Sequence, residues 1–67
     1  MDPEIEKCIE ILDEISDDTT DALIAYLREK DKFRKQIALS IYERLDKKRA
    51  EMARRLYELT KQKWNLK

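Results

Sequence analysis

The chain is 67 residues long, and its 15 basic and 15 acidic side chains give a formal net charge of zero. It contains no Gly and no His, which excludes glycine-rich phosphate loops, dinucleotide fingerprints and hydrolytic sites built on histidine. We therefore expect one small domain that is not an enzyme and uses no cofactor. The longest apolar run, residues 22–27, is too short for a membrane span or a secretory signal, which predicts a cytoplasmic protein.

The charges are sorted along the chain. Residues 1–27 contain nine acidic side chains and one basic one, whereas residues 28–67 contain six acidic and fourteen basic ones. Segments of opposite charge attract each other within a chain, between two chains or towards a charged partner. A charged fraction of 45% with a single Asn is also typical of proteins from thermophiles.

The first predicted helix begins at Asp2 and Pro3, because aspartate caps free N–H groups and proline suits the first helical position. An apolar stripe follows at helical spacing, formed by Ile5, Cys8, Ile9, Leu12 and Ile15. Residues 16–20 carry short polar side chains that compete for backbone groups, which predicts the end of this helix and the cap of a second short one. In the second helix, residues 22–27 are apolar nearly all round and are predicted to lie at the centre of the core. A bend or loop is expected at residues 28–32, where the pattern is wholly polar.

From about Asp31 the pattern predicts one long helix that continues to the C-terminus. Apolar residues recur every four positions at Phe33, Ile37, Ile41 and Leu45, and every seven at Ala38, Leu45, Met52, Leu59 and Leu66. Both series are interpreted as a single apolar face. Opposite charges at i, i+4 spacing favour an unbroken helix, in the series Glu43, Lys47, Glu51 and Arg55. At about 1.5 Å per residue this helix would reach roughly 50 Å, farther than two short helices can cover, so part of its apolar face is expected to need a partner.

These elements predict an all-α fold of two short N-terminal helices and one long C-terminal helix, arranged as a helical hairpin or as three helices. We expect a single domain over residues 1–67. Within it, residues 1–30 would form an acidic two-helix part and residues 31–67 a long basic helix.

Few side chains point to chemistry. Cys8 belongs to the apolar stripe and is surrounded in sequence by acids, which favours an inert core thiol over a nucleophile. Five carboxylates near the first helix junction offer hard oxygen ligands for a divalent cation, but they match no calcium-loop spacing and are interpreted as caps and solvated charge: Asp13, Glu14, Asp17, Asp18 and Asp21. We therefore predict no catalytic residues and no metal site.

The basic half of the chain offers contacts to phosphate or to an acidic surface. Its candidates lie on adjoining strips of the long helix: Arg44, Lys47, Lys48, Arg54, Arg55 and Lys61. Tyr57 and Trp64 could stack on bases. Glu51 and Glu58 lie among the basic residues, however, which favours a solvated charged face over a nucleic-acid contact. Trp64, close to the end of the chain, either folds back on the core or anchors a partner.

The segment Gln36-Ile37-Ala38-Leu39-Ser40-Ile41-Tyr42-Glu43 resembles a degenerate PIP box, the peptide by which replication proteins bind the DNA sliding clamp, PCNA. In that pattern a Gln is followed three residues later by an aliphatic residue and six and seven later by two aromatics. Gln36, Leu39 and Tyr42 match, and Glu43 occupies the last aromatic place. In size and helical character the chain resembles the small clamp-inhibitor proteins of hyperthermophilic archaea. The resemblance implies that residues 36–42 bind the clamp and that the rest of the chain interferes with its ring.

The sequence therefore predicts a non-enzymatic interaction or regulatory protein that docks an amphipathic helix on a partner protein, with a sliding clamp and inhibition of DNA replication as the named candidate. Two alternatives remain, a basic helical nucleic-acid-binding protein and a simple helical homodimer. The residues predicted to bind the partner are Gln36, Leu39, Ile41, Tyr42, Tyr57 and Trp64.

Overall fold

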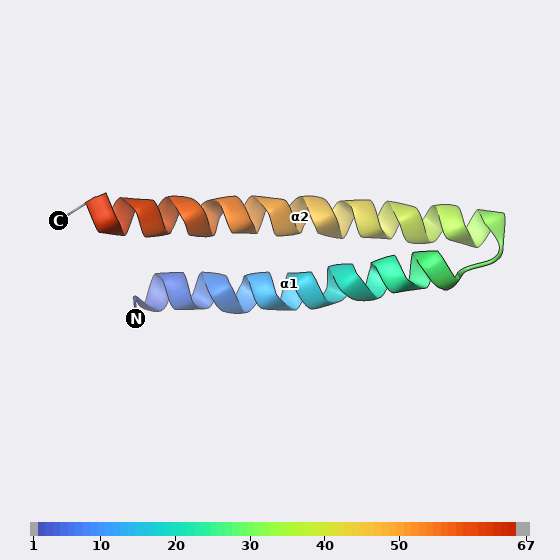
Figure 1. Cartoon of the computed structure of the whole chain (residues 1–67), viewed down its shortest axis with the longest axis horizontal. Coiled ribbons are helices and arrows are strands. Elements are labelled where there is room, and N and C mark those ends of the chain that lie inside the picture. The colour runs from blue at the N-terminus through green and yellow to red at the C-terminus, as the bar shows by residue number, and fades with distance from the viewer. Residues whose placement is uncertain (1, 66–67) are drawn as a thin grey trace.

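A computed structural model shows two antiparallel helices joined by a tight turn (Figure 1). Helix α1 is Pro3–Arg28 and helix α2 is Lys32–Asn65. The structure describes residues 2–65, with side chains described for residues 2–63. Its principal extents are 54 × 15 × 12 Å. The Cα radius of gyration is 15.5 Å, against about 11 Å for a compact domain of this length. The predicted all-α class is correct, and the molecule is a thin rod.

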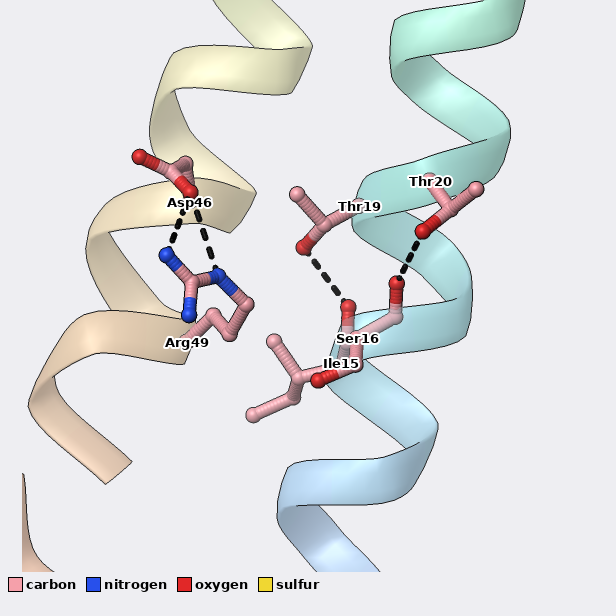
Figure 2. Close-up of polar contacts among 6 residues, drawn as sticks. All are labelled: Ile15, Ser16, Thr19, Thr20, Asp46 and Arg49. Carbon is pink, nitrogen blue, oxygen red and sulfur yellow. Dashed lines mark hydrogen bonds and ion pairs between the residues drawn. The ribbon is translucent and has the colours of Figure 1, made fainter. Parts of the chain in front are cut away.

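The prediction of two short N-terminal helices is wrong, because α1 is a single helix of 26 residues. The polar segment at residues 16–20 does not end it. Thr19 Oγ1 donates to the Ile15 carbonyl at 2.6 Å, and Thr20 Oγ1 donates to the Ser16 carbonyl at 3.0 Å (Figure 2). Both hydroxyls therefore bond to a carbonyl four residues back in the same helix, a geometry that satisfies them without releasing the backbone.

The start of α1 is as predicted. Asp2 has an extended backbone and its carboxylate accepts from the backbone N–H groups of Glu4 at 2.8 Å and Ile5 at 3.4 Å, while Pro3 occupies the first helical position. The cap satisfies N–H groups that have no partner within the helix.

The predicted loop at residues 28–32 is also found, and it closes without glycine. No described residue has a positive φ. Two carboxylates bind the backbone N–H groups of the turn. Glu29 Oε1 accepts from the N–H groups of Lys30 and Asp31, both at 3.2 Å. Asp31 Oδ2 caps α2 by accepting from the Arg34 N–H at 2.9 Å. Because acidic side chains take up the turn's N–H groups, the chain can reverse within three residues.

The two helices meet along a heptad seam, as in an antiparallel coiled coil. In α1, half-buried or buried positions recur every seven residues at Ile5, Leu12, Thr19 and Tyr26, and again at Cys8, Ile15 and Ala22. In α2 the corresponding series are Lys35, Tyr42, Arg49 and Leu56, and Ala38, Leu45, Met52 and Leu59. Since α1 runs along most of α2 (Figure 1), the expected large overhang of the C-terminal helix is not present.

The core of the hairpin is small. Among the described side chains only Cys8, 4% exposed, and Thr19, 6% exposed, are buried, and none is completely enclosed. The α2 side of the seam includes charged residues, and Arg49 turns back to Asp46 through bonds of 2.9 and 3.1 Å (Figure 2). Residues 22–27 are not the core centre that was predicted, because Ile24 and Leu27 are exposed. A seam of this composition leaves much apolar surface uncovered.

The charge ladder predicted on the long helix forms no ion pair among the described side chains. The pairs that α2 makes within itself are Arg49 with Asp46 at 2.9 Å and Arg54 with Glu58 at 3.3 Å. The helix is nevertheless continuous through residues 46–51, as the sequence predicts. The two apolar series of α2, however, are two faces and not one. The seven-residue series faces α1, whereas Phe33, Ile37 and Ile41 of the four-residue series are exposed.

Candidate interaction surfaces

Most of the exposed large apolar side chains lie in the half of the hairpin nearest the turn. Five of them lie within residues 24–41, and we call them the apolar tip: Ile24 at 41% exposure, Leu27 at 64%, Phe33 at 75%, Ile37 at 49% and Ile41 at 49%. Their number is large for a chain of this size, since single exposed apolar residues are ordinary but concentrated ones mark interaction sites.

The geometry of α2 explains how the apolar tip arises. Residues four apart on a helix are neighbours on its surface, so Phe33, Ile37 and Ile41 form one strip. The half-buried positions in this part of α2 are Lys35, Ala38, Leu39 and Tyr42, which identifies the side that faces α1. The strip at Phe33 and Ile37 therefore points away from α1 and has no apolar cover within the described part of the chain.

Of the three residues that match the PIP box, only Gln36 is exposed. Leu39 and Tyr42 are half-buried on the side that faces α1. Leu39 lines a shallow hollow with Tyr26, Lys32, Lys35 and Gln36. Beside it, the Lys35 ammonium lies 5.0 Å from the centre of the Tyr26 ring, a cation–π geometry that links the helices near the turn. The aliphatic and aromatic members of the box are thus partly occupied by the hairpin itself, whereas Ile41 is free.

The six basic candidates are all exposed along α2: Arg44, Lys47, Lys48, Arg54, Arg55 and Lys61. Tyr57 is 65% exposed near the opposite end from the turn. Carboxylates interrupt this surface, and Arg54 is bonded to Glu58. The side chain of Trp64, another predicted partner-binding residue, lies outside the described side chains.

A groove of about 400 Å³ opens between the helices towards the chain ends. It is lined by Glu4, Lys7, Cys8, Ile11, Met52, Arg55 and Leu59. Cys8 forms its floor, where Sγ lies 3.8 Å from the Met52 carbonyl oxygen. The thiol is buried, as the sequence predicts for a core residue. Ile11, 37% exposed, and Arg55 form opposite rims of this groove.

An ion pair joins the open ends of the two helices. Lys63 Nζ lies 3.0 Å from Asp2 Oδ2 and 4.0 Å from Glu4 Oε2. The hydrogen bond from Lys63, aided by the Glu4 backbone N–H, lowers the pKa of the Asp2 carboxyl. In the same way the hydrogen bond to Asp2 raises the pKa of Lys63. The Asp2 carboxylate therefore both caps α1 and holds α2.

No group of three or more acidic or cysteine side chains within residues 2–63 is placed closely enough to hold a metal ion. Neither described helix combines the length and apolar character needed to cross a bilayer. Comparison with known proteins found no matching family model, no matching curated protein and no matching solved structure.

Of the residues predicted to bind a partner, Ile41 and Tyr57 are exposed. The sequence predicts residues 22–27, which include Ile24 and Leu27, to lie in the core, and Phe33 and Ile37 to share one apolar face with the residues that contact α1. The signal that could have separated them is the phase of the repeats. The four-residue series of α2 drifts away from the seven-residue series within two turns, so the two cannot share one face for long.

Proposed function

We propose that this chain is a non-enzymatic interaction protein whose apolar tip docks on a partner protein. The observation that carries the proposal is the exposed strip of Phe33, Ile37 and Ile41 on α2, with Phe33 at 75% exposure. Fully burying such a side chain contributes about 1.5–3 kcal/mol, so covering this strip would favour association with a partner. An exposed aromatic flanked by aliphatic residues has the composition of a binding hot spot.

The sliding clamp is the named candidate for that partner. Its support is the match of Gln36, Leu39 and Tyr42 to the PIP box. Because Leu39 and Tyr42 are half-buried against α1, binding through the box requires the hairpin to open near the turn. Binding through the apolar tip requires no opening. The two modes can be separated by substitution.

The experiment compares three forms of the chain as bait in extract from the host cells. Phe33→Ser with Ile37→Ser removes the centre of the apolar tip, and Tyr57→Ser is the matched control because Tyr57 is as exposed but lies away from the tip. We expect a protein that is retained by the native chain and by the control and lost by the tip variant, and that binds the native chain again after purification. Equal retention by all three forms would overturn the proposal.

A second arm uses purified sliding clamp from a hyperthermophilic archaeon, titrated by calorimetry. Under the tip mode the clamp binds the native chain, and Phe33→Ser with Ile37→Ser lowers the affinity at least tenfold while Tyr42→Ala has a smaller effect. A larger effect of Tyr42→Ala indicates the box. If the clamp does not bind, it is not the partner. The proposal that the apolar tip docks on some protein is then decided by the retention experiment in host extract.

Nucleic-acid binding remains an alternative function, favoured by the exposure of all six basic candidates on α2. It predicts binding to a DNA duplex whose affinity falls steeply with salt, because phosphate contacts release counterions. Docking through the apolar tip depends far less on salt. Titration of a fluorescent duplex at two salt concentrations separates these outcomes.

A further inference from the structure

The hairpin exposes more surface than a folded monomer of its mass. Its accessible surface is 5857 Å², whereas a compact monomer of 8.1 kDa exposes about 4,500 Å². The excess, roughly 1,300 Å², exceeds the approximately 800 Å² that each partner buries in a standard protein interface. Part of it follows from the rod shape, which presents two long flanks between the helices. The flank that carries the groove is partly apolar.

The groove marks the partly apolar flank. Residues seven apart share a side of a helix in this seam, so the groove residues Cys8, Met52 and Leu59 extend along the rod into Ile15 and Leu45. Of these side chains Cys8 is buried and the others are half-buried. Ile11 and Ile41 are exposed on the two rims of the groove. We call these seven residues together the groove face.

The rims of the groove face differ in charge, although the basic Lys7 also lines the groove on the α1 side. On the α1 side, Glu4 and Asp18 lie on the same row as Ile11, seven residues apart from it. On the α2 side, Lys48 and Arg55 lie on the same row as Ile41. Lys48 and Arg55 are exposed and make no ion pair among the described side chains. Each groove face therefore has an acidic rim and a basic rim on either side of apolar residues.

From this arrangement we infer that a second copy of the chain packs on the groove face and forms a twofold symmetric four-helix bundle. A surface with one acidic and one basic rim is complementary to its own copy, as a twofold interface requires. The apolar residues of the groove face supply burial, and the rims supply orientation. The inference concerns a surface separate from the apolar tip, with only Ile41 common to both, so it does not depend on the proposed function.

Charge selects between the two ways of stacking the hairpins. A twofold axis parallel to the rod places α1 on α2 of the copy, and an axis across the rod places α1 on α1 of the copy. Helix α1 has ten charged side chains, eight of them acidic, and α2 has fifteen, eleven of them basic. The net charges are −6 and +7, so only the parallel axis brings opposite charges together. It also makes every neighbouring pair of helices antiparallel, the usual order of a four-helix bundle.

The parallel axis has two structural consequences. Rotation about it keeps each residue at its height along the rod, so Glu4 of one copy meets Arg55 of the other, since both line the same end of the groove. The two turns also lie at the same end of the bundle. A dimer would thus present two apolar tips side by side, and a partner with two sites would be held by both at once.

The first test is the mass of the native chain in solution, measured by sedimentation equilibrium over a hundredfold range of concentration. We expect twice the chain mass of 8.1 kDa at the upper end. Ile11→Asp, which puts a charge in the groove face, should shift the dissociation constant at least tenfold upwards, while Tyr57→Asp, on the other flank, should leave it nearly unchanged. Circular dichroism of both variants verifies that the helices persist. A single-chain mass at every concentration, or equal effects of the two variants, would overturn the dimer.

The second test determines the orientation of the axis. Lys30→Cys places one exposed thiol in the turn of each chain for a spin label, whereas the native Cys8 thiol is buried, and electron paramagnetic resonance measures the distance between the labels. The parallel axis predicts about 20 Å, two helix diameters. A distance near the 54 Å length of the rod would overturn the charge argument. Phe33→Ser with Ile37→Ser should leave mass and label distance unchanged, so failure of the apolar tip and failure of the dimer are distinguishable.

Discussion

Thr19 shows how one side chain weakens the seam of this hairpin. It occupies a position between Leu12 and Tyr26 in the heptad series and is 6% exposed. Its hydroxyl is satisfied by the Ile15 carbonyl at 2.6 Å, but that carbonyl already serves as the acceptor for the helix backbone. The hydroxyl therefore adds little to stability and replaces a methyl group that would contact α2.

We expect Thr19→Val to raise the stability of the hairpin. Valine keeps the shape of threonine and exchanges a desolvated hydroxyl for a methyl group, a gain of about 1 kcal/mol or roughly 5 °C in Tm for a domain of this size. Thermal unfolding followed by circular dichroism measures it. Thr20→Val is the matched control: Thr20 makes the same bond to the Ser16 carbonyl but is exposed, so its Tm should change little. A fall in Tm with Thr19→Val would show that the hydroxyl bond stabilises the seam.

At the scale of the helices, the sequence predicts the ends better than the middle. Asp2 and Asp31 act through N–H groups two or three residues away, so their effect is local and is readable from the chain. The segment at residues 16–20 has the same residue types, yet it is helical. Short polar side chains favour a cap or an internal back-bond according to whether the helix on both sides is held by packing. Here α2 packs along α1 on both sides of the segment, and the sequence of residues 16–20 contains no information about that contact.

The candidate surface was hard to predict for a similar reason. Leu39 and Tyr42 resemble a binding motif, and Phe33 and Ile37 resemble a core stripe. Which stripe of α2 faces α1 depends on the phase in which the two helices pair, and that phase is set by Cys8, Ile15 and Ala22 on the other helix. Local periodicity identifies both stripes of α2, and only the pairing assigns one of them to the core.

The ion pair at the open ends of the helices makes a prediction about pH. The pKa of Asp2 is below its ordinary value of 3.8, so the stabilisation from this carboxylate is complete above that pH and is lost as the pH falls through the lower, folded-state pKa. The pKa of Lys63 is above its ordinary value of 10.5, so its contribution is complete below that pH and is lost at higher pH. At pH values between these two pKa values, the ion pair should therefore hold the ends of the two helices together.

Carbon-detected NMR titration of the Asp2 carboxyl tests this. Lys63→Gln removes the largest cause of the shift, so the Asp2 pKa should move up towards its ordinary value, while the bond from the Glu4 N–H keeps it slightly lowered. Lys61→Gln is the control, because Lys61 is exposed and makes no ion pair among the described side chains. An Asp2 pKa that is the same in all three proteins would mean that the pair does not form in solution.

At the scale of the whole molecule, attraction between two oppositely charged helices should add to the stabilisation from the small core. Helices in contact lie about 8–10 Å apart, well within the distance over which charges act at low salt, since the Debye length is about 30 Å at 0.01 M and about 3 Å at 1 M. Individual exposed ion pairs contribute little. The net charges of −6 on α1 and +7 on α2 act together, however, and burial is too limited to mask them.

Raising the salt concentration should therefore destabilise this hairpin. Between 0.01 M and 1 M sodium chloride we expect Tm to fall by about 5 °C, the equivalent of roughly 1 kcal/mol for a chain of this size, measured by circular dichroism at a concentration where the mass is that of one chain. Asp13→Asn with Asp17→Asn and Asp21→Asn halves the charge of α1 at exposed positions, so this variant should have a lower Tm at low salt and a weaker salt dependence. If Tm instead stays constant or rises with salt in the native chain, the sorted charges do not hold the helices together, and their role must lie in contacts with other molecules.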